Sequence, residues 1–532
     1  MNPGQICKTL STLKSLRSPH ESVWRDCYDH SYPIRGNGFL NDQMSAQEAQ
    51  NRKSRMIDGT TTDAVKILSS AMMSGLTPAN SLWFGMDVGQ ESEEERRWLD
   101  GSADILWQNI HAANFDAAGY EGMIDAVCAG WFVMYIDQDY ERGGFTFDLW
   151  PISSVYCSAS KPGGKVDTVY REYKLTAEQA VNEFGEENLS EATRKLAKDK
   201  PQQLVEFVHA IFPRSTHMVG ARLAKNMPVA SIKVEVAAKQ TVSESGYHEM
   251  PVVVPRWMMI PDSVYAVGPV FDALPDSRTL NELCRMDLAA GDLAIAGMWI
   301  AEDDGVLNPR TVKVGPRKII VANSVDSMKP LQSGSNFQYA ESKIARLQGA
   351  IRKTLMADQL QAQDGPAMTA TEVHVRVALI RQLLGPVYGR MQAEYLQPLI
   401  ERCFGIAYRA GVLGQAPESL AGRNFTVRYL SPLARSQKLE EVTAIEQYIN
   451  GELVAAQVKP EVLDNIDFDE ASRFKGEALG VPSAIIRSTA ARDQIREQRA
   501  QEQQAAQEQQ QQMAMQQMAG EAALKSQPGA AA

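Results

Sequence analysis

Few residues in this 532-residue chain stand at the spacings that catalysis requires. The sequence contains no GxxxxGKS or GxxxxGKT phosphate loop, no GxSxG nucleophile elbow and no HExxH metal motif. The nearest glycine-rich stretch, 35–38 (RGNG), does not follow an expected strand and lacks a third glycine. His374 lies beside Glu372 on an expected helix, where such a histidine is more often structural than a ligand. Residues 303–305 (DDG) lack the downstream ligands of a calcium loop. The sequence therefore favours a structural protein over an enzyme, without cofactor or metal.

The most informative charged residues lie on two consecutive expected helices, of which the first has a negative net charge and the second a positive one. Residues 270–296 carry five acids and two bases, whereas residues 341–357 carry four bases and one acid. The two helices could pair as an antiparallel hairpin, could pair with copies of themselves in a neighbouring subunit, or could present solvated faces. Because an exposed ion pair contributes only about 0–1 kcal/mol, any function would lie in alignment rather than in stability. The acids are Asp272, Asp276, Glu282, Asp287 and Asp292, and the bases are Lys343, Arg346, Arg352 and Lys353.

Residues 268–411 form the stretch that positions these charges. Apolar residues at helical spacing predict a helix over 268–296 and a second over 339–360, separated by a β-like segment at about 299–321. The stretch 363–367 (QDGPA) breaks the pattern, and a third helix is expected from 369 to about 410. About forty helical residues would span roughly 60 Å, with kinks at Pro386 and Pro398. Periodicity alone allows an ordinary core helix of a large α-rich protein equally well.

The rest of the chain predicts an α+β fold. Residues 1–130 are expected to be mostly helical. The expected helices are 6–16, 20–32 after a break at Ser18-Pro19, a helix that is capped by Thr62 or Asp63 and ended by 75–78, and 91–113. Residues 131–257 read as β, with a hairpin of 132–136 and 145–150, strands at 166–173, 204–212 and 231–236, and short helices at 176–184 and 190–197. A strand at 424–430 precedes helices at 434–450, 460–463 and 469–479.

Bulk properties exclude several classes of protein. The length suggests two to four domains, and a net charge of −11 gives no large basic face for gripping nucleic acid, although DNA could pass by. Six cysteines without a CxxC pair indicate separate reduced thiols. The N-terminus lacks the apolar core of a signal peptide, and the most apolar windows, 126–136 and 288–301, are too short to span a membrane. Residues 498–517 hold eleven glutamines, which predicts a long helix ending near Gly520 or, alternatively, a disordered low-complexity tail.

Four stretches resemble the portal proteins, or head-to-tail connectors, of short-tailed double-stranded DNA phages. They are 18–24 (SPHESVW) with Arg25 and Asp26; 71–78 (AMMSGLTP) followed by Trp83 and Phe84, which is the most specific; 265–275 (YAVGPVFDALP) with 279–281 (TLN); and 429–434 (YLSPLA). The sequence departs from the family at Ala266-Val267, where a Gly-Arg-like pair would be expected. The resemblance covers about residues 5–480.

The resemblance implies a ring of twelve copies around a channel at one capsid vertex, through which a separate terminase motor pumps DNA and through which DNA leaves at infection. It divides the chain into a wing (1–267, with the long wing helix 369–411), a stem (268–296 and 339–358), a clip (297–338) and a tunnel loop (359–368). A strand at 412–433 would return to the wing and a crown would occupy 434–482. Residues 483–520 would form a helical barrel or tail, and 521–532 would be disordered.

The resemblance also implies roles for particular residues. The four stem bases would brush DNA or bond to a neighbour's stem acids, namely Asp276, Glu282 and Asp287. The tunnel loop would present Gln361, Gln363, Asp364, Gly365 and Pro366, and the clip would meet a tail adaptor through Arg310, Lys313, Arg317 and Lys318.

The implied partners are further copies of the chain, the terminase large subunit, tail adaptor and tail tube proteins, major capsid and scaffolding proteins, and double-stranded DNA without sequence specificity. The protein would be assembled in the host cytoplasm and reside in the virion, with no membrane partner. Two other classes stay open: a DNA-packaging or nucleic-acid-processing enzyme, and a soluble scaffold that acts through the Gln-rich helix as a monomer or small coiled coil.

Overall fold

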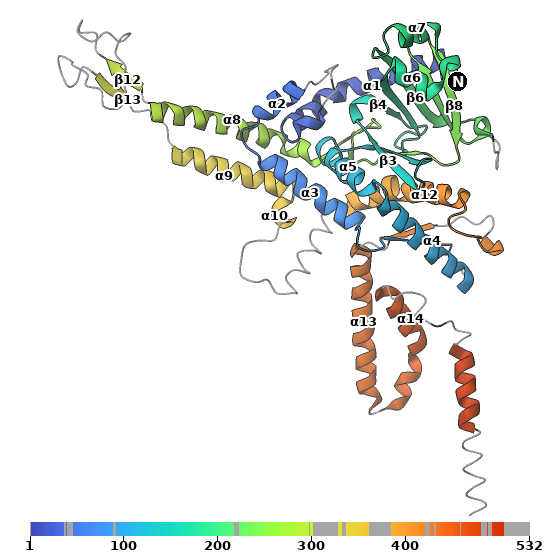
Figure 1. Ribbon diagram of the computed structural model, residues 1–532. Helices are drawn as coiled ribbons and strands as arrows, with labels where there is room; N and C mark the ends of the chain where they lie inside the picture. The colour runs from blue at the N-terminus through green and yellow to red at the C-terminus, as the bar shows by residue number, and fades with distance from the viewer. Residues whose placement is uncertain are drawn as a thin grey trace, which may run out of the picture. The chain divides into compact units, whose positions relative to one another are not determined.

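The computed structural model combines helices with antiparallel sheets, which confirms the α+β class (Figure 1). It describes residues 2–36, 39, 46–88, 92–217, 223–296, 298–301, 328–331, 337–360, 385–420, 426–429, 432–457, 459–479, 487 and 492–504. The chain forms two compact units. The first comprises residues 1–82 and 105–414, and the second comprises 83–104 and 415–532.

The first unit begins with one continuous helix, α1 (Pro3–Asp29), so the expected break at Ser18-Pro19 is wrong. Contacts on both sides of Pro19 hold the helix together. The buried Arg17 donates to the carbonyl oxygens of Ile152 and Val155, and the Trp24 indole donates to the Ala266 carbonyl at 3.0 Å. These tertiary contacts outweigh the cost, about 3 kcal/mol, of proline inside a helix.

Three further helices of the first unit follow α1 along the chain. They are α2 (Ala46–Ser54), α3 (Thr60–Leu76) and α5 (Phe115–Ala129). The helix α5 packs against both α1 and α3. The expected caps Thr62 and Asp63 lie inside α3; the helix instead begins after Gly59, and Asp58 Oδ1 accepts from the amide of Thr60. Its end at Leu76 agrees with the prediction. The helix α4 (Glu93–Ala112) confirms the helix expected over 91–113.

The predicted hairpin is confirmed as β2 (Val133–Gln138) and β3 (Phe145–Trp150), which pair antiparallel. The strand β9 (Val252–Val253) completes a three-stranded sheet in the order β3-β2-β9. A short pair, β10 (Met258–Met259) and β11 (Ala266–Val267), leads to the central helices.

A five-stranded antiparallel sheet follows the order β4-β5-β6-β7-β8. Even-numbered residues of β6, such as Val208 and Ala210, pack against Ile6 and Leu10 of α1. Odd-numbered residues, such as Phe207, pack against the short helices on the opposite face, as the period of two requires. The strands β4 and β8 were not predicted. The bounds are β4 (Val155–Ser158), β5 (Thr168–Thr176), β6 (Leu204–Pro213), β7 (Val229–Glu235), β8 (Gln240–Tyr247), α6 (Ala177–Phe184) and α7 (Glu191–Asp199).

The central stretch forms a long helical hairpin. The helix α8 (Pro269–Ala296) leads into β12 (Met298–Ala301), which pairs antiparallel with β13 (Met328–Leu331) before α9 (Phe337–Thr354) returns. The second helix is shorter than expected, because Met356 adopts φ 56° and separates α9 from α10 (Ala357–Leu360). Of the third expected helix, residues 385–391 are helical and continue through a π turn (Gln392–Leu396) into α12 (Gln397–Arg409).

The second unit contains a two-stranded sheet, β1 (Phe84–Asp87) with β14 (Thr426–Tyr429). The helices α13 (Pro432–Ala456) and α14 (Phe468–Leu479) lie side by side, joined through a 3-10 turn (Pro460–Asn465), and Lys475 forms an ion pair with Glu446 between them. Residues 492–504 are helical, and the remainder of the Gln-rich tail lies outside the described residues.

Candidate subunit interface and channel wall

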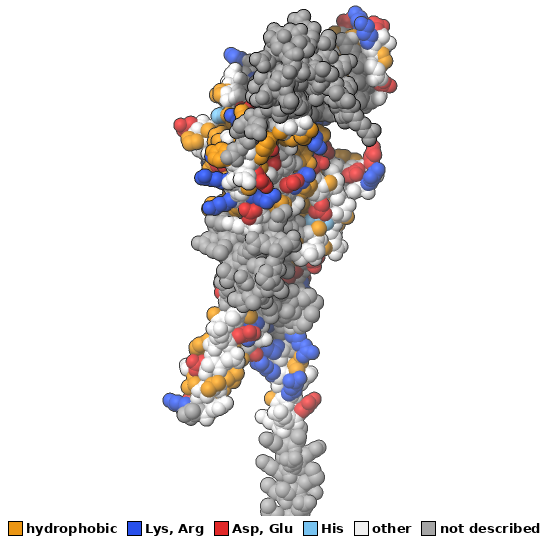
Figure 2. All heavy atoms as spheres, turned by 90° about the vertical axis from the view of Figure 1, so that its left-hand side faces the viewer, with side chains coloured by type: hydrophobic (Ala, Val, Ile, Leu, Met, Phe, Trp, Pro, Cys, Tyr) orange, Lys and Arg blue, Asp and Glu red, His pale blue; other side chains and the backbone are white. Residues whose placement is uncertain are grey.

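The helices α8 and α9 lie side by side and carry the β12–β13 pair at their far end (Figure 1). Figure 2 looks onto the side of the molecule that bears this hairpin, and shows acidic, basic and hydrophobic side chains intermingled on the described surface. Several large apolar side chains of the hairpin are exposed, among them Met286, Leu288 and Ile295 on α8 and Tyr339 on α9. An apolar and charged surface of this kind is suited to contact with another protein.

The four bases of α9 are all exposed, and none forms an ion pair among the described residues. Their spacing divides them. At about 100° per residue, Lys343, Arg346 and Lys353 share one side of α9, whereas Arg352 lies on a different side. The structure therefore brings three of the four predicted bases together.

The acids of α8 are not equivalent either. Glu282 is exposed and bonds to Arg285 of the same helix at 2.6 Å, and this hydrogen bond lowers the pKa of the Glu282 carboxyl. Asp276 and Asp287 are half-buried, and neither forms an ion pair among the described residues. Within the described chain, no ion pair joins α8 to α9, so Asp276, Asp287 and the four bases of α9 stay available to other molecules.

A set of polar contacts fixes the hairpin to the rest of the first unit. Asn281 of α8 accepts from the amide of Ile57 at 2.7 Å and donates to the carbonyl of Arg55 at 2.9 Å. Gln348 of α9 donates to Asp58 Oδ2 at 2.8 Å. The segment that joins α2 to α3 is thus bonded to both helices of the hairpin.

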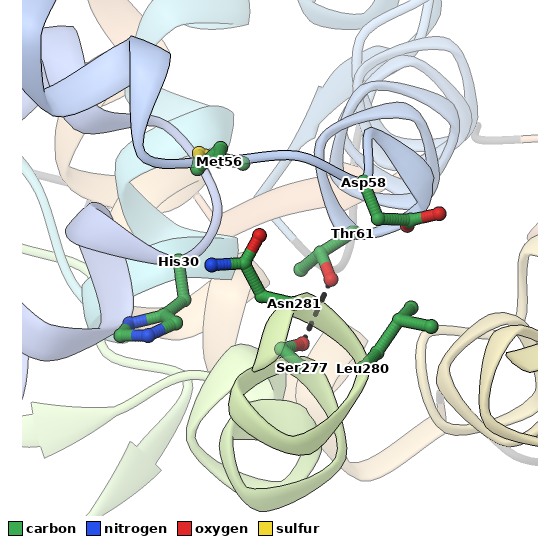
Figure 3. A pocket seen from close by; sticks show the side chains of 7 residues that line it. All are labelled: His30, Met56, Asp58, Thr61, Ser277, Leu280 and Asn281. Carbon is green, nitrogen blue, oxygen red and sulfur yellow. Dashed lines mark hydrogen bonds between the residues drawn. The ribbon is translucent and has the colours of Figure 1, made fainter. Parts of the chain in front are cut away.

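Figure 3 shows a small cavity at this attachment. It lies among side chains of three segments and has a volume of about 10 Å³, enough for roughly one water molecule. Its wall includes the hydroxyl pair Thr61–Ser277 at 2.7 Å. We therefore interpret the cavity as part of the packing of α8 and not as a ligand site. The lining residues are His30, Met56, Asp58, Thr61, Ser277, Leu280 and Asn281.

The helix that continues into α12 is held by buried charge pairs that the sequence did not predict. Arg256, 1% exposed, binds Glu394 of the π turn through two nitrogens, at 2.6 and 2.9 Å. Its guanidinium also donates to the carbonyl oxygens of Gly164 and Val264. The ion pair could not be predicted from the sequence, because Arg256 and Glu394 are far apart in the chain and neither belongs to a local motif.

A second charge cluster surrounds Glu249. Burial acts to raise the pKa of this carboxyl, but hydrogen bonds and charge from Arg409 and Arg402 outweigh it and leave the pKa lowered. The Arg402 guanidinium also lies over the Tyr247 ring, 4.9 Å from its centroid. Both clusters attach α12 to the β-rich part of the first unit.

Several predicted site residues lie outside the described residues: Gln361, Gln363, Asp364, Gly365 and Pro366 of the expected tunnel loop, and Arg310, Lys313, Arg317 and Lys318 of the expected clip. His374 and residues 303–305 lie outside them as well. Among the residues that the structure does describe, no group of His, Cys, Asp and Glu side chains is arranged to hold a metal ion. Within the same residues, no helix combines the length and apolar character needed to cross a membrane.

Comparison with known proteins gives the class of the chain. The family model described as "Bacteriophage head to tail connecting protein" matches residues 4–486. The "Probable portal protein" of Bordetella phage BPP-1 is 27% identical over 500 residues, covering 92% of this chain and 89% of the relative. The "Portal protein" of Salmonella phage epsilon15 is 29% identical over 517 residues, covering 93% and 91%.

Among solved structures, the "Neck of empty GTA particle computed with C6 symmetry" is similar at 12% identity and a TM-score of 0.37, covering 76% of this chain and 90% of that one.

The chain therefore belongs to the bacteriophage head to tail connecting protein family. It is a connector of the portal type, a structural component of a phage virion, and the resemblance found in the sequence is confirmed.

Proposed function

We propose that copies of this chain close into a ring, expected to contain twelve, at one vertex of the capsid, and that the hole of the ring conducts the genome during packaging and ejection. The observation that carries the proposal is the α8–α9 hairpin. Its two helices have opposite net charge, and among the described residues no ion pair joins α8 to α9, although Glu282 pairs with Arg285 within α8. When identical hairpins stand side by side, the acidic helix of each hairpin meets the basic helix of its neighbour, so the opposite charges pair between subunits.

In this proposal α8 and α9 form the stem, and residues 297–338 form the clip that meets the tail adaptor through Arg310, Lys313, Arg317 and Lys318. Residues 359–368 form the tunnel loop around Gln361, Gln363, Asp364, Gly365 and Pro366. The wing comprises residues 1–267 and the long wing helix (369–411), and 412–433 returns to it. The crown comprises 434–482, and 483–520 forms a barrel or tail.

The proposed partners of the ring follow from its position between head and tail. They are the terminase large subunit, the tail adaptor and tube proteins, and the major capsid and scaffolding proteins, met during assembly in the host cytoplasm. Double-stranded DNA passes without sequence-specific contacts, since a chain with 65 acids and 54 bases does not hold many phosphates. The chain performs no catalytic step in this proposal; the motor that consumes ATP is a separate protein.

Charge reversal tests the role of the stem. The variant K343E/R346E/K353E should lower the fraction of chains in rings by about tenfold, because it opposes like charges across each contact, which costs on the order of 1 kcal/mol or more. Adding E282K/D287K should restore rings by re-creating opposite charge. Lys195→Glu on α7, which alters an exposed side chain that pairs with Glu191 of the same helix, is the matched control.

Sedimentation velocity reads the fraction of rings in each variant. Rings that form normally from the triple variant would show that these bases do not face a neighbour. A triple variant that forms rings but packages less DNA would instead assign them to the channel wall.

A further inference from the structure

The helix at residues 492–504, which we call the tail helix, has almost no apolar surface with which to bind the rest of the second unit. Arg492 and Ile495 are half-buried, and every other position of the helix is exposed. A short polar helix is only marginally stable by itself in water, because its first turn is costly to form. Polar contacts are therefore what hold the tail helix in place.

These contacts meet at Asp469, in the first turn of α14. Its Oδ2 accepts hydrogen bonds from Arg496 at 2.6 Å and from Arg492 at 3.0 Å, and its Oδ1 accepts from Arg496 at 2.8 Å. The two arginines are four residues apart, so they lie on the same face of the tail helix. One carboxylate thus binds two guanidinium groups, and it binds Arg496 through both oxygens, which is the strong geometry for such a pair. The hydrogen bond from Arg496 lowers the pKa of the Asp469 carboxyl.

Asp469 is free for this role because another side chain caps α14. Asp467 Oδ1 accepts from the amides of Asp469 and Glu470, both at 3.0 Å. Among the described residues, every hydrogen bond between the tail helix and α14 ends on the Asp469 carboxylate. The attachment of the tail helix therefore depends on a single negative charge.

We propose that Asp469 is a charge-operated latch, which docks the tail helix on α14 at low ionic strength and releases it at high ionic strength. The inference goes beyond the proposed ring, because the contact lies within one copy of the chain. Solvent ions reach this contact, since the Asp469 and Arg496 side chains are 37% and 57% exposed, whereas the Arg256–Glu394 pair is 1% and 11% exposed. Salt screens exposed pairs far more than buried ones, so the latch opens while the fold persists.

Hydrogen exchange of the full chain tests the latch, both in purified rings and in chains dispersed from them. At about 50 mM salt, Asp469→Asn should raise the exchange rate of amides 495–500 by about fivefold or more, because a neutral side chain no longer binds the guanidinium groups as an ion pair. Raising the salt to about 500 mM should do the same to the unmodified chain and change the variant little.

Glu470→Gln is the matched control, because it removes a charge from the same turn that forms no ion pair among the described residues. Amides 473–479 of α14 should exchange equally in all samples, which verifies that the helix stays folded. Equal exchange of 495–500 in the Asp469→Asn and unmodified chains would overturn the inference, as would an equal rise in the Glu470→Gln chain. Protection that appears only in rings, whichever residue stands at 469, would show that neighbouring copies hold the tail helix and would overturn it as well.

Variants of the tail helix test the other side of the contact. Arg496→Gln should release the helix about as much as Asp469→Asn does, and the double variant should add little, because both changes break one contact. Arg499→Gln is the control, since Arg499 lies one turn further on and forms no ion pair among the described residues. Additive effects of the two single changes would overturn the role given to Asp469.

Discussion

Arg256 and Glu394 show how single residues hold the long helix in place. The pair is almost fully enclosed, and two main-chain carbonyls accept hydrogen bonds from two further N–H groups of the guanidinium. The π turn at Gln392–Leu396 also brings Tyr395 into the core, against Phe115 and Phe132. π turns are rare and recur where a helix must place particular side chains, as it does here.

Glu394→Ala should destabilise the first unit by about 3–5 kcal/mol, because it leaves a buried guanidinium without its counter-charge. Urea unfolding of dispersed chains measures the loss. The matched control is Glu282→Ala, which removes an exposed pair and should change stability by about 0–1 kcal/mol. A similar loss in both variants would contradict the structural role of Arg256–Glu394.

His209 predicts an acid sensitivity of the five-stranded sheet. Burial, and then the charges of Lys233 and Arg171, lower the pKa of its imidazole from 6.5 to about 3, and the ring bonds to Ser231 at 2.8 Å. The folded chain keeps the ring neutral, whereas the unfolded chain takes up a proton below pH 6.5. Stability from this group is therefore complete above pH 6.5 and falls as the pH is lowered toward 3, by roughly 1.4 kcal/mol per pH unit.

His209→Gln should remove this part of the pH dependence. The free energy of unfolding should fall less between pH 7 and pH 5 in the variant than in the unmodified chain, as measured by urea unfolding at both values. The control is His217→Gln, which alters an exposed histidine. Parallel losses in the unmodified and His209→Gln chains would exclude His209 as the source.

At the scale of elements, local patterns predicted helices and strands well but not the contacts that override them. The α6 capping box at Thr176 and Gln179 formed as its residues indicate. The break at Pro19 did not form, because Arg17 and Trp24 bond to segments more than a hundred residues away. The attachment of the hairpin through Asn281 could not be predicted either, because its hydrogen-bond partners, Arg55 and Ile57, are distant in the sequence.

Asn281→Ala should loosen the attachment of the stem without unfolding it. Two backbone hydrogen bonds of the α2–α3 connection are lost, at about 1 kcal/mol each. Hydrogen exchange at residues 55–60 should therefore accelerate, while exchange in α12 stays unchanged. Thr279→Ala is the control, because its hydroxyl donates to the Pro275 carbonyl of its own helix. Unchanged exchange at 55–60 would show that Asn281 does not hold this segment.

At the scale of the whole molecule, the features that the sequence revealed are those a ring requires. Opposite charge on consecutive helices could be read from the sequence, as could the lack of a catalytic pattern. The orientation of the charges could not, because it depends on which face of α9 packs on α8. The division of Lys343, Arg346 and Lys353 from Arg352 follows from their spacing on a helix, whereas the direction in which each side of α9 faces does not. The contact of Asp469 with the tail helix likewise depends on how two helices lie together, which no local motif encodes.

The central claim is that identical copies of the chain surround a channel. Native mass spectrometry of the purified protein, combined with negative-stain images of the same sample, tests it most directly. We predict a closed ring with a central hole and a mass that is a whole multiple of 58.7 kDa, with twelve as the expected multiple. Single chains alone, at concentrations and salt where the related portals assemble, would contradict the account.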